Sequence, residues 1–141
     1  RISHRVHYRY IDPQSDWKVG HTPFLAIFKN YRGQKVDLQN RFIHEYIFDN
    51  EGGNLNRARY RATLISSQQY KGLQPFIADE LFYNYRTGRY FRNWIMVGAV
   101  FNVDKDLRLN IFYRNDIQES QDNKSYWNSR NGIFVSAYLI F

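Results

Sequence analysis

The chain has 141 residues, a formal net charge of +7, no cysteine and a mean hydropathy of −0.65. This length suits a single domain, residues 1–141, and the lack of cysteine excludes a disulfide framework and a thiolate metal site. The uncharged runs are far shorter than the roughly 18 residues of a membrane-spanning helix, which excludes a helical membrane protein. Because the sequence begins at Arg1 and not at a methionine, we expect a processed or truncated N-terminus.

Aromatic residues form 18% of the chain, with 12 Tyr and 11 Phe. A high aromatic content with a low mean hydropathy is typical of a transmembrane β-barrel, because only alternate residues of its strands face lipid. The basic charge favours an anionic neighbour, such as nucleic acid, phospholipid or lipopolysaccharide. A solvated basic surface without a partner is the alternative interpretation.

Alternating apolar and polar residues predict strands through most of the chain. In the first half, strands are predicted over residues 2–10, 24–31, 38–48 and 55–66. Clusters of Gly, Pro, Asp and Asn predict a long loop over 11–23 and turns over 32–34 and 49–53.

The second half continues the pattern, with strands predicted over residues 76–85, 91–103, 107–115 and 131–141. A minimal connection is predicted at Asp104-Lys105, and a long polar loop over 116–130. Long and short connections alternate, as they do when one rim of a barrel faces the periplasm and the other the outside. We predict an all-β fold, an antiparallel up-and-down transmembrane β-barrel with about eight strands in this chain and room for more in the full-length protein.

The closing strand, residues 131–141, alternates over its whole length and ends on Phe141. An aromatic C-terminus after alternating apolar residues resembles the signal that outer-membrane barrels present to their assembly machinery. We therefore predict an insertion signal in Tyr138, Leu139 and Phe141. A buried strand of a soluble β-sandwich is the alternative for this segment.

One face of the predicted strands is rich in arginine. Arginine on the lipid face of a barrel costs roughly 2–4 kcal/mol at the bilayer midplane, so we expect these side chains to point inward. The predicted interior polar network consists of Arg41, Glu45, Arg57, Arg59, Arg61, Glu80, Arg92 and Arg108. Eight strands leave room only for side chains, which predicts a closed polar plug; a barrel widened by further strands would have an anion-attracting lumen. Asp79 and Glu80 are adjacent and must face opposite sides, so we expect a displaced register, a bulge or a shielding partner protein near Asp79.

Four histidines, His4, His7, His21 and His44, raise the question of a hydrolase or a metal site. His44 and Glu45 face opposite sides of a strand, and no G-x-S-x-G elbow accompanies the serines. His4 and His7 also point to opposite faces, and no H-E-x-x-H motif is present. We therefore expect no catalytic residue, metal or cofactor, with a lipid-modifying outer-membrane enzyme kept as an alternative.

The basic segment R-A-R-Y-R, residues 57–61, interleaves charge with an aromatic ring. Such a segment can form a stacking platform for nucleic acid on a sheet. The apolar opposite faces of the strands favour lipid instead, so we expect no nucleic-acid partner.

Three segments carry a resemblance to a known family: R-A-R-Y-R (57–61), P-F-I-A-D-E-L-F (75–82) and R-N-W-I-M-V-G (92–98). Together they resemble an uncharacterised family of bacterial outer-membrane β-barrels, a domain of unknown function common in Bacteroidetes and Proteobacteria. The resemblance covers roughly residues 36–141, and it departs from the family at Asn93-Trp94, where Asn-Arg often stands. It implies a barrel in the outer membrane and no particular activity.

These observations predict a non-enzymatic protein of the bacterial outer membrane, a structural or accessory subunit of an envelope assembly. Its expected partners are membrane lipid, lipopolysaccharide, the barrel-assembly machinery and other outer-membrane subunits. A small anion-favouring pore is the first alternative. A soluble lipocalin-like barrel is disfavoured, because such barrels hold ligands in apolar interiors.

Overall fold

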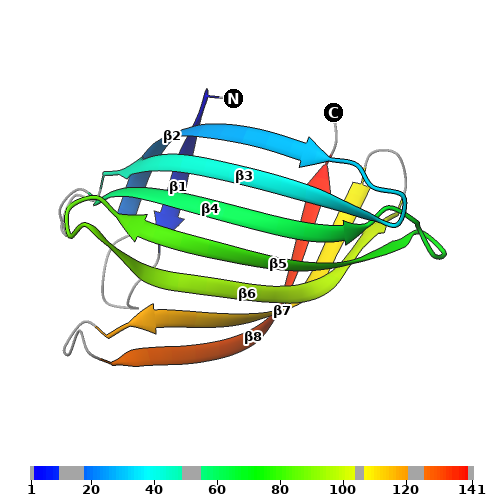
Figure 1. Cartoon of the computed structure of the whole chain (residues 1–141). Coiled ribbons are helices and arrows are strands. Elements are labelled where there is room, and N and C mark those ends of the chain that lie inside the picture. Colours follow the sequence, from blue (N-terminus) through cyan, green and yellow to red (C-terminus); the bar gives the residue numbers. More distant parts are fainter. Residues whose placement is uncertain (1, 10–17, 49–54, 104–106, 121–125, 140–141) are drawn as a thin grey trace.

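In a computed structural model, the chain folds into one antiparallel β-sheet (Figure 1). The structure describes residues 2–9, 18–48, 55–103, 107–120 and 126–139. The strands are β1 (Ile2–Arg9), β2 (Lys18–Tyr31), β3 (Val36–Ile47), β4 (Leu55–Ser66), β5 (Leu73–Asn84), β6 (Arg89–Asn102), β7 (Leu107–Glu119) and β8 (Trp127–Leu139). In this part of the chain, no helix has the length and hydropathy to cross a membrane.

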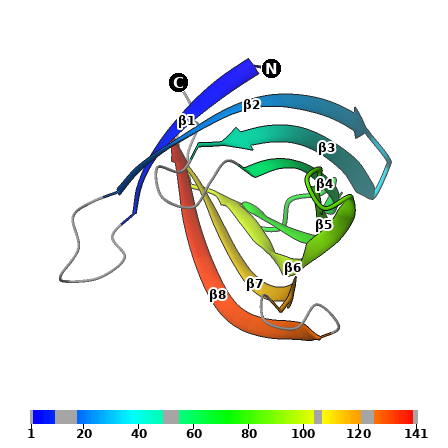
Figure 2. The same ribbon diagram turned by 90° about the vertical axis from the view of Figure 1, so that its left-hand side faces the viewer.

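Each strand pairs with the next one along the chain, so the order in the eight-stranded sheet runs from β1 to β8. Every pairing is antiparallel, which confirms the predicted all-β, up-and-down arrangement. Figure 2 shows the sheet curling around a concave face, with β1 and β8 as its two edges. No pairing joins β8 to β1 within the described ranges, so the sheet is open between them.

Two predicted loops are shorter than expected because strands extend into them. The loop predicted over 11–23 is wrong in its second half, since residues 18–23 belong to β2 and pair with β1. The loop predicted over 116–130 is wrong at both ends, where β7 and β8 continue to pair. Asp116 lies opposite Arg130 in this extension. Polar residues therefore continue these strands, and those on the concave face, such as Asp116, lie among other charged side chains.

The connections divide between the two rims of the sheet. One rim holds the ends of β1, β3, β5 and β7 and, among the described connections, the one over residues 85–88. The other, which we call the short-turn rim, holds the ends of β2, β4 and β6 and the described connections over 32–35 and 67–72. The turns predicted at 49–53 and at Asp104-Lys105 lie outside the described residues.

The two faces of the sheet differ in polarity, because successive side chains of a strand point to opposite sides. On the convex face, Ile27, Val97, Ile111 and Val135 are between 51% and 67% exposed. Most buried apolar side chains lie on the concave face: Ala26, Ile43, Ile65, Ala78, Phe82, Met96 and Val100. The core of the protein thus lines the concave face, beside the charged residues described below.

Gly98 of β6 allows aromatic rings to pack across the concave face. It lies in register between Phe76 of β5 and Phe112 of β7, and Phe112 lies opposite Phe134 of β8. The Phe76 and Phe112 ring centroids are 6.3 Å apart, and the Phe112 and Phe134 rings stack at 5.6 Å. A Cβ atom at Gly98 would lie 2.3 Å from the carbonyl oxygen of Ile111. The close approach of the two backbones therefore leaves no room for a side chain here.

We expect Gly98→Ala to lower the free energy of unfolding by about 1–3 kcal/mol, because the added methyl group forces β6 and β7 apart. Gly132→Ala is the matched control, since its Cβ would meet only the ring of Phe134, at 3.1 Å. Urea unfolding of the refolded protein measures both effects. A Gly98→Ala variant as stable as the parent would contradict the close approach.

Candidate functional site

The arginines of β4 all reach the concave face. Arg57, Arg59 and Arg61 occupy alternate positions of this strand, so their side chains leave it on the same side. The neighbouring strands supply the acids, because Glu45 of β3 lies opposite Arg57 and Glu80 of β5 lies opposite Arg61. Strand register therefore places a row of three cations between two carboxylates.

Arg59 joins the two carboxylates at the centre of this arrangement. Its Nη1 donates to Glu45 Oε1 at 2.7 Å, and its Nε donates to Glu80 Oε1 at 2.9 Å. The Glu45 and Glu80 side chains are 1% and 0% exposed, and that of Arg59 is 9% exposed. The centre of the cluster is thus shielded from water, where unpaired charge is costly and paired charge interacts strongly.

Three further arginines complete the ion pairs. Arg57 Nε donates to Glu45 Oε2 at 2.6 Å, Arg61 Nε donates to Glu80 Oε2 at 2.8 Å, and Arg41 Nη2 donates to Glu80 Oε1 at 3.1 Å. We call this cluster the Arg–Glu network; it consists of Arg41, Glu45, Arg57, Arg59, Arg61 and Glu80. Four arginines share two carboxylates, so the network keeps a positive charge.

Aromatic rings also lie against guanidinium groups of the concave face, both inside and outside the Arg–Glu network. The Cζ atoms of Arg57 and Arg59 lie 5.5 and 5.0 Å from the ring centroid of Phe82, which is buried. The Cζ atom of Arg114 in β7 lies 4.3 Å from the Trp94 centroid and 3.8 Å from that of Phe134. Cation–π attraction at these distances partly compensates for the loss of water around the cations.

The remaining predicted network residues, Arg92 and Arg108, lie outside the Arg–Glu network. Arg92 Nε donates to Asp116 Oδ1 at 2.8 Å, and its Nη2 also binds this carboxylate. Arg108 faces the concave side near the short-turn rim, is exposed, and donates from Nε to Asn102 Oδ1 at 3.1 Å. The predicted set therefore forms three separate groups: the Arg–Glu network, the pair of Arg92 with Asp116, and Arg108. Sequence reasoning missed Asp116, because it assigned this residue to a loop.

Asp79 faces the convex side, opposite to Glu80, as the alternation requires. The Asn93 side-chain amide donates to Asp79 Oδ1 at 2.6 Å, which satisfies this outward carboxylate. A register shift in this pair of strands lies further on, between Phe82 and Tyr83. The displacement expected at Asp79 is therefore wrong, and a neighbouring side chain is its partner within the protein.

The predicted insertion signal falls largely outside the structure. Tyr138 and Leu139 pair through their backbones with the start of β7, at Arg108 and Leu107. Their side chains, and all of Phe141, lie outside the described residues.

Of the four histidines, only His44 has a described side chain. It lies on the convex face, with Nε2 at 2.6 Å from Asn56 Oδ1 and its ring 5.2 Å from that of Tyr85. A cluster of three or more metal-binding side chains does not occur in the part of the chain that the structure describes.

Fold and site together define an all-β protein whose antiparallel sheet has a mostly apolar convex face and a charged concave face. The model of a family described as "Protein of unknown function (DUF2490)" matches residues 2–127. The chain belongs to the DUF2490 family, which confirms the resemblance to a family of unknown function. Neither the curated proteins nor the solved structures gave a significant match to this chain.

We expect Glu80→Gln to lower the free energy of unfolding by about 3–5 kcal/mol, because it leaves Arg41, Arg59 and Arg61 without their shared anion. The matched control is Glu119→Gln, which breaks the more exposed pair with Arg89 and should cost at most about 1 kcal/mol. Urea unfolding at low ionic strength compares the two variants. Equal losses of stability would show that the burial of Glu80 carries no special weight.

Proposed function

We propose that this chain forms the wall of a bacterial outer-membrane β-barrel and acts as a non-enzymatic structural or accessory subunit of an envelope assembly. The observation that carries the proposal is the mostly apolar convex face, on which every strand from β2 to β8 exposes large apolar side chains. A water-soluble protein rarely exposes so large an apolar surface without a partner. Lipid is the partner that suits a whole curved face, with lipopolysaccharide at its outer edge.

Strand length and aromatic placement support the same proposal. Strands β2 to β8 have 12 to 14 residues each, enough for the roughly 9–11 residues with which a tilted strand crosses a bilayer. Strand β6 exposes the aromatic residues Tyr90 and Phe101 at its two ends and the aliphatic Val97 between them, whereas other strands also expose aromatic rings in their middle. Outer-membrane barrels have such aromatic girdles at both interfaces.

Membrane insertion also requires that the sheet closes. An unpaired strand edge in lipid leaves backbone groups without hydrogen bonds, at several kcal/mol for each group. Under this proposal, β1 and β8 pair directly in the membrane or are joined through additional strands. The barrel-assembly machinery and other outer-membrane subunits are the partners that this route of insertion implies.

Single cysteines test the orientation of the convex face. In liposomes, Val97→Cys and Ile111→Cys should resist a water-soluble maleimide, because lipid covers both positions. Arg86→Cys, in the turn between β5 and β6, is the control and should react rapidly. Mass spectrometry measures the modified fraction over time. Reaction of Val97→Cys as fast as Arg86→Cys would refute the membrane proposal.

A small anion-favouring pore is a second candidate, supported by the excess of arginine on the concave face. Water in a lumen would screen these charges, and anions would be attracted to them. Planar bilayers should then show channels with a higher permeability to chloride than to potassium, and Arg108→Gln should reduce this preference. A protein that inserts but does not conduct, or that prefers cations, would contradict the pore and favour a closed interior.

A further inference from the structure

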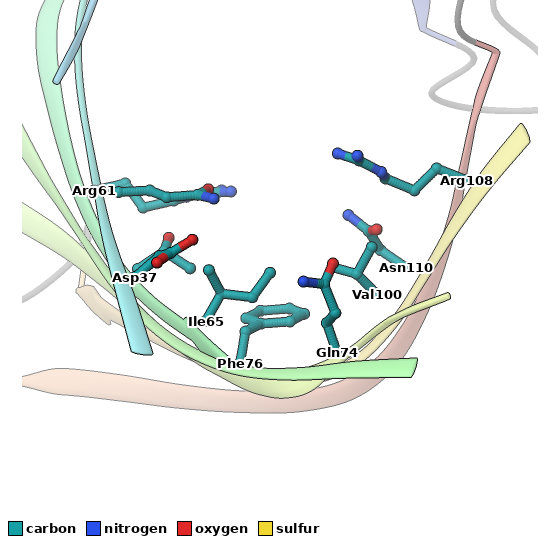
Figure 3. Close-up of a pocket in the computed structure, with 10 residues that line it drawn as sticks. Asp37, Arg61, Ile65, Gln74, Phe76, Val100, Arg108 and Asn110 are labelled. Carbon is teal, nitrogen blue, oxygen red and sulfur yellow. The ribbon is translucent and has the colours of Figure 1, made fainter. Parts of the chain in front are cut away.

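A polar cavity of about 200 Å³ lies on the concave face near the short-turn rim, between β3 and β7 (Figure 3). Its floor is apolar, formed by Ile65, Phe76 and Val100. Its walls carry both hydrogen-bond donors and acceptors. None of the network's acids lines it, but Arg61 belongs both to the Arg–Glu network and to the wall of the cavity.

Two guanidinium groups face each other across the cavity. Arg61 extends from β4 and Arg108 from β7, on opposite sides of the open space (Figure 3). Arg61 uses Nε and Nη2 for Glu80, which leaves Nη1 directed elsewhere. Arg108 uses only Nε, for Asn102, and its two terminal nitrogens have no partner among the described residues. Paired arginines with unused N–H groups are the arrangement that recognises phosphate or carboxylate through several charged hydrogen bonds.

The walls also contain acceptors that a simple anion would not use. Asn110 Oδ1 is shielded from solvent and has no donor among the described residues. The carboxylate of Asp37 also lines the cavity, where its Oδ1 accepts from Ser67 Oγ at 2.7 Å and from the backbone N–H of Gly33 at 3.2 Å. A buried acceptor without a donor is rare, and a rotation of the Asn110 amide toward the cavity would let it accept from a hydroxyl group there. The ligand should therefore carry hydroxyl groups as well as negative charge.

We propose that this cavity binds a phosphorylated polyol the size of one sugar ring. The phosphate lies between Arg61 and Arg108, a hydroxyl donates to Asn110 Oδ1, and the ring rests on Phe76. The volume is below the roughly 300–1,000 Å³ of sites for drug-sized ligands, so it suits a single ring. A soluble sugar phosphate and the phosphorylated sugar headgroup of a lipid share this chemistry. The site lies on the concave face, so the proposal stands independently of membrane insertion.

Isothermal titration of the refolded full chain tests the proposal with glucose 6-phosphate, glucose and inorganic phosphate. Glucose 6-phosphate should bind at least about tenfold more tightly than either of the others, because only it engages both arginines and acceptors. Arg108→Gln should weaken its binding by about tenfold or more. The matched control is Arg89→Gln. It also removes one positive charge, but at the start of β6, at the rim of the sheet away from the cavity, and it should leave binding unchanged. Equal weakening by both variants would overturn the proposal in favour of general charge attraction.

A second variant separates polyol recognition from anion binding. Asn110→Leu keeps the approximate volume and removes the acceptor, so it should weaken the binding of glucose 6-phosphate and leave the binding of inorganic phosphate unaffected.

Detergent micelles carrying monophosphoryl lipid A, a phosphorylated glucosamine lipid, form the other arm of the experiment. Binding that depends on Arg108 in this arm alone would assign the site to a lipid headgroup. Absence of binding that depends on Arg108 in both arms would refute the proposal.

Discussion

The organisation of the concave face depends on the carboxylate of Glu80, which is shared by Arg41, Arg59 and Arg61. Its side chain is fully buried, and a charge in this position is tolerated only because cations surround it. Without this acid, three like charges would lie together on one side of the sheet. Arg59 extends the same stabilisation to Glu45, so that β3, β4 and β5 are joined by side chains as well as by backbone hydrogen bonds.

A sheet that places charge on its inner side and apolar residues on its outer side reverses the usual arrangement of a soluble protein. The buried apolar residues do not separate from the charged ones; they share the concave face, where rings such as Phe82 and Trp94 lie against guanidinium groups. This mixture explains how a chain with low mean hydropathy can still bury charged and apolar side chains side by side. The convex face exposes mostly apolar side chains, which is the basis of the membrane proposal.

Much of this arrangement can be predicted from the sequence, because a period of two residues is visible in a single chain. The period identified the strands and grouped Arg57, Arg59 and Arg61 on one face. It could not establish which arginine pairs with which acid, because the sequence of one strand does not determine its register with the next strand. For the same reason, the partner of Asp79 was found only in the structure. Strand ends were also missed where polar residues such as Asp116 continue the ladder, because loop prediction relies on polarity.

The order of the strands has a consequence for how the protein folds. Every observed pairing joins neighbours in the sequence, so each hairpin can form with little loss of chain entropy. Such local topologies fold faster than those in which distant segments must meet. The closure that the membrane proposal requires, in which the first strand is joined to the last, is the exception, because it brings together strands that are far apart in the sequence. This step, whether direct or through further strands, would be the slowest, and until it occurs two strand edges remain free to pair with another molecule.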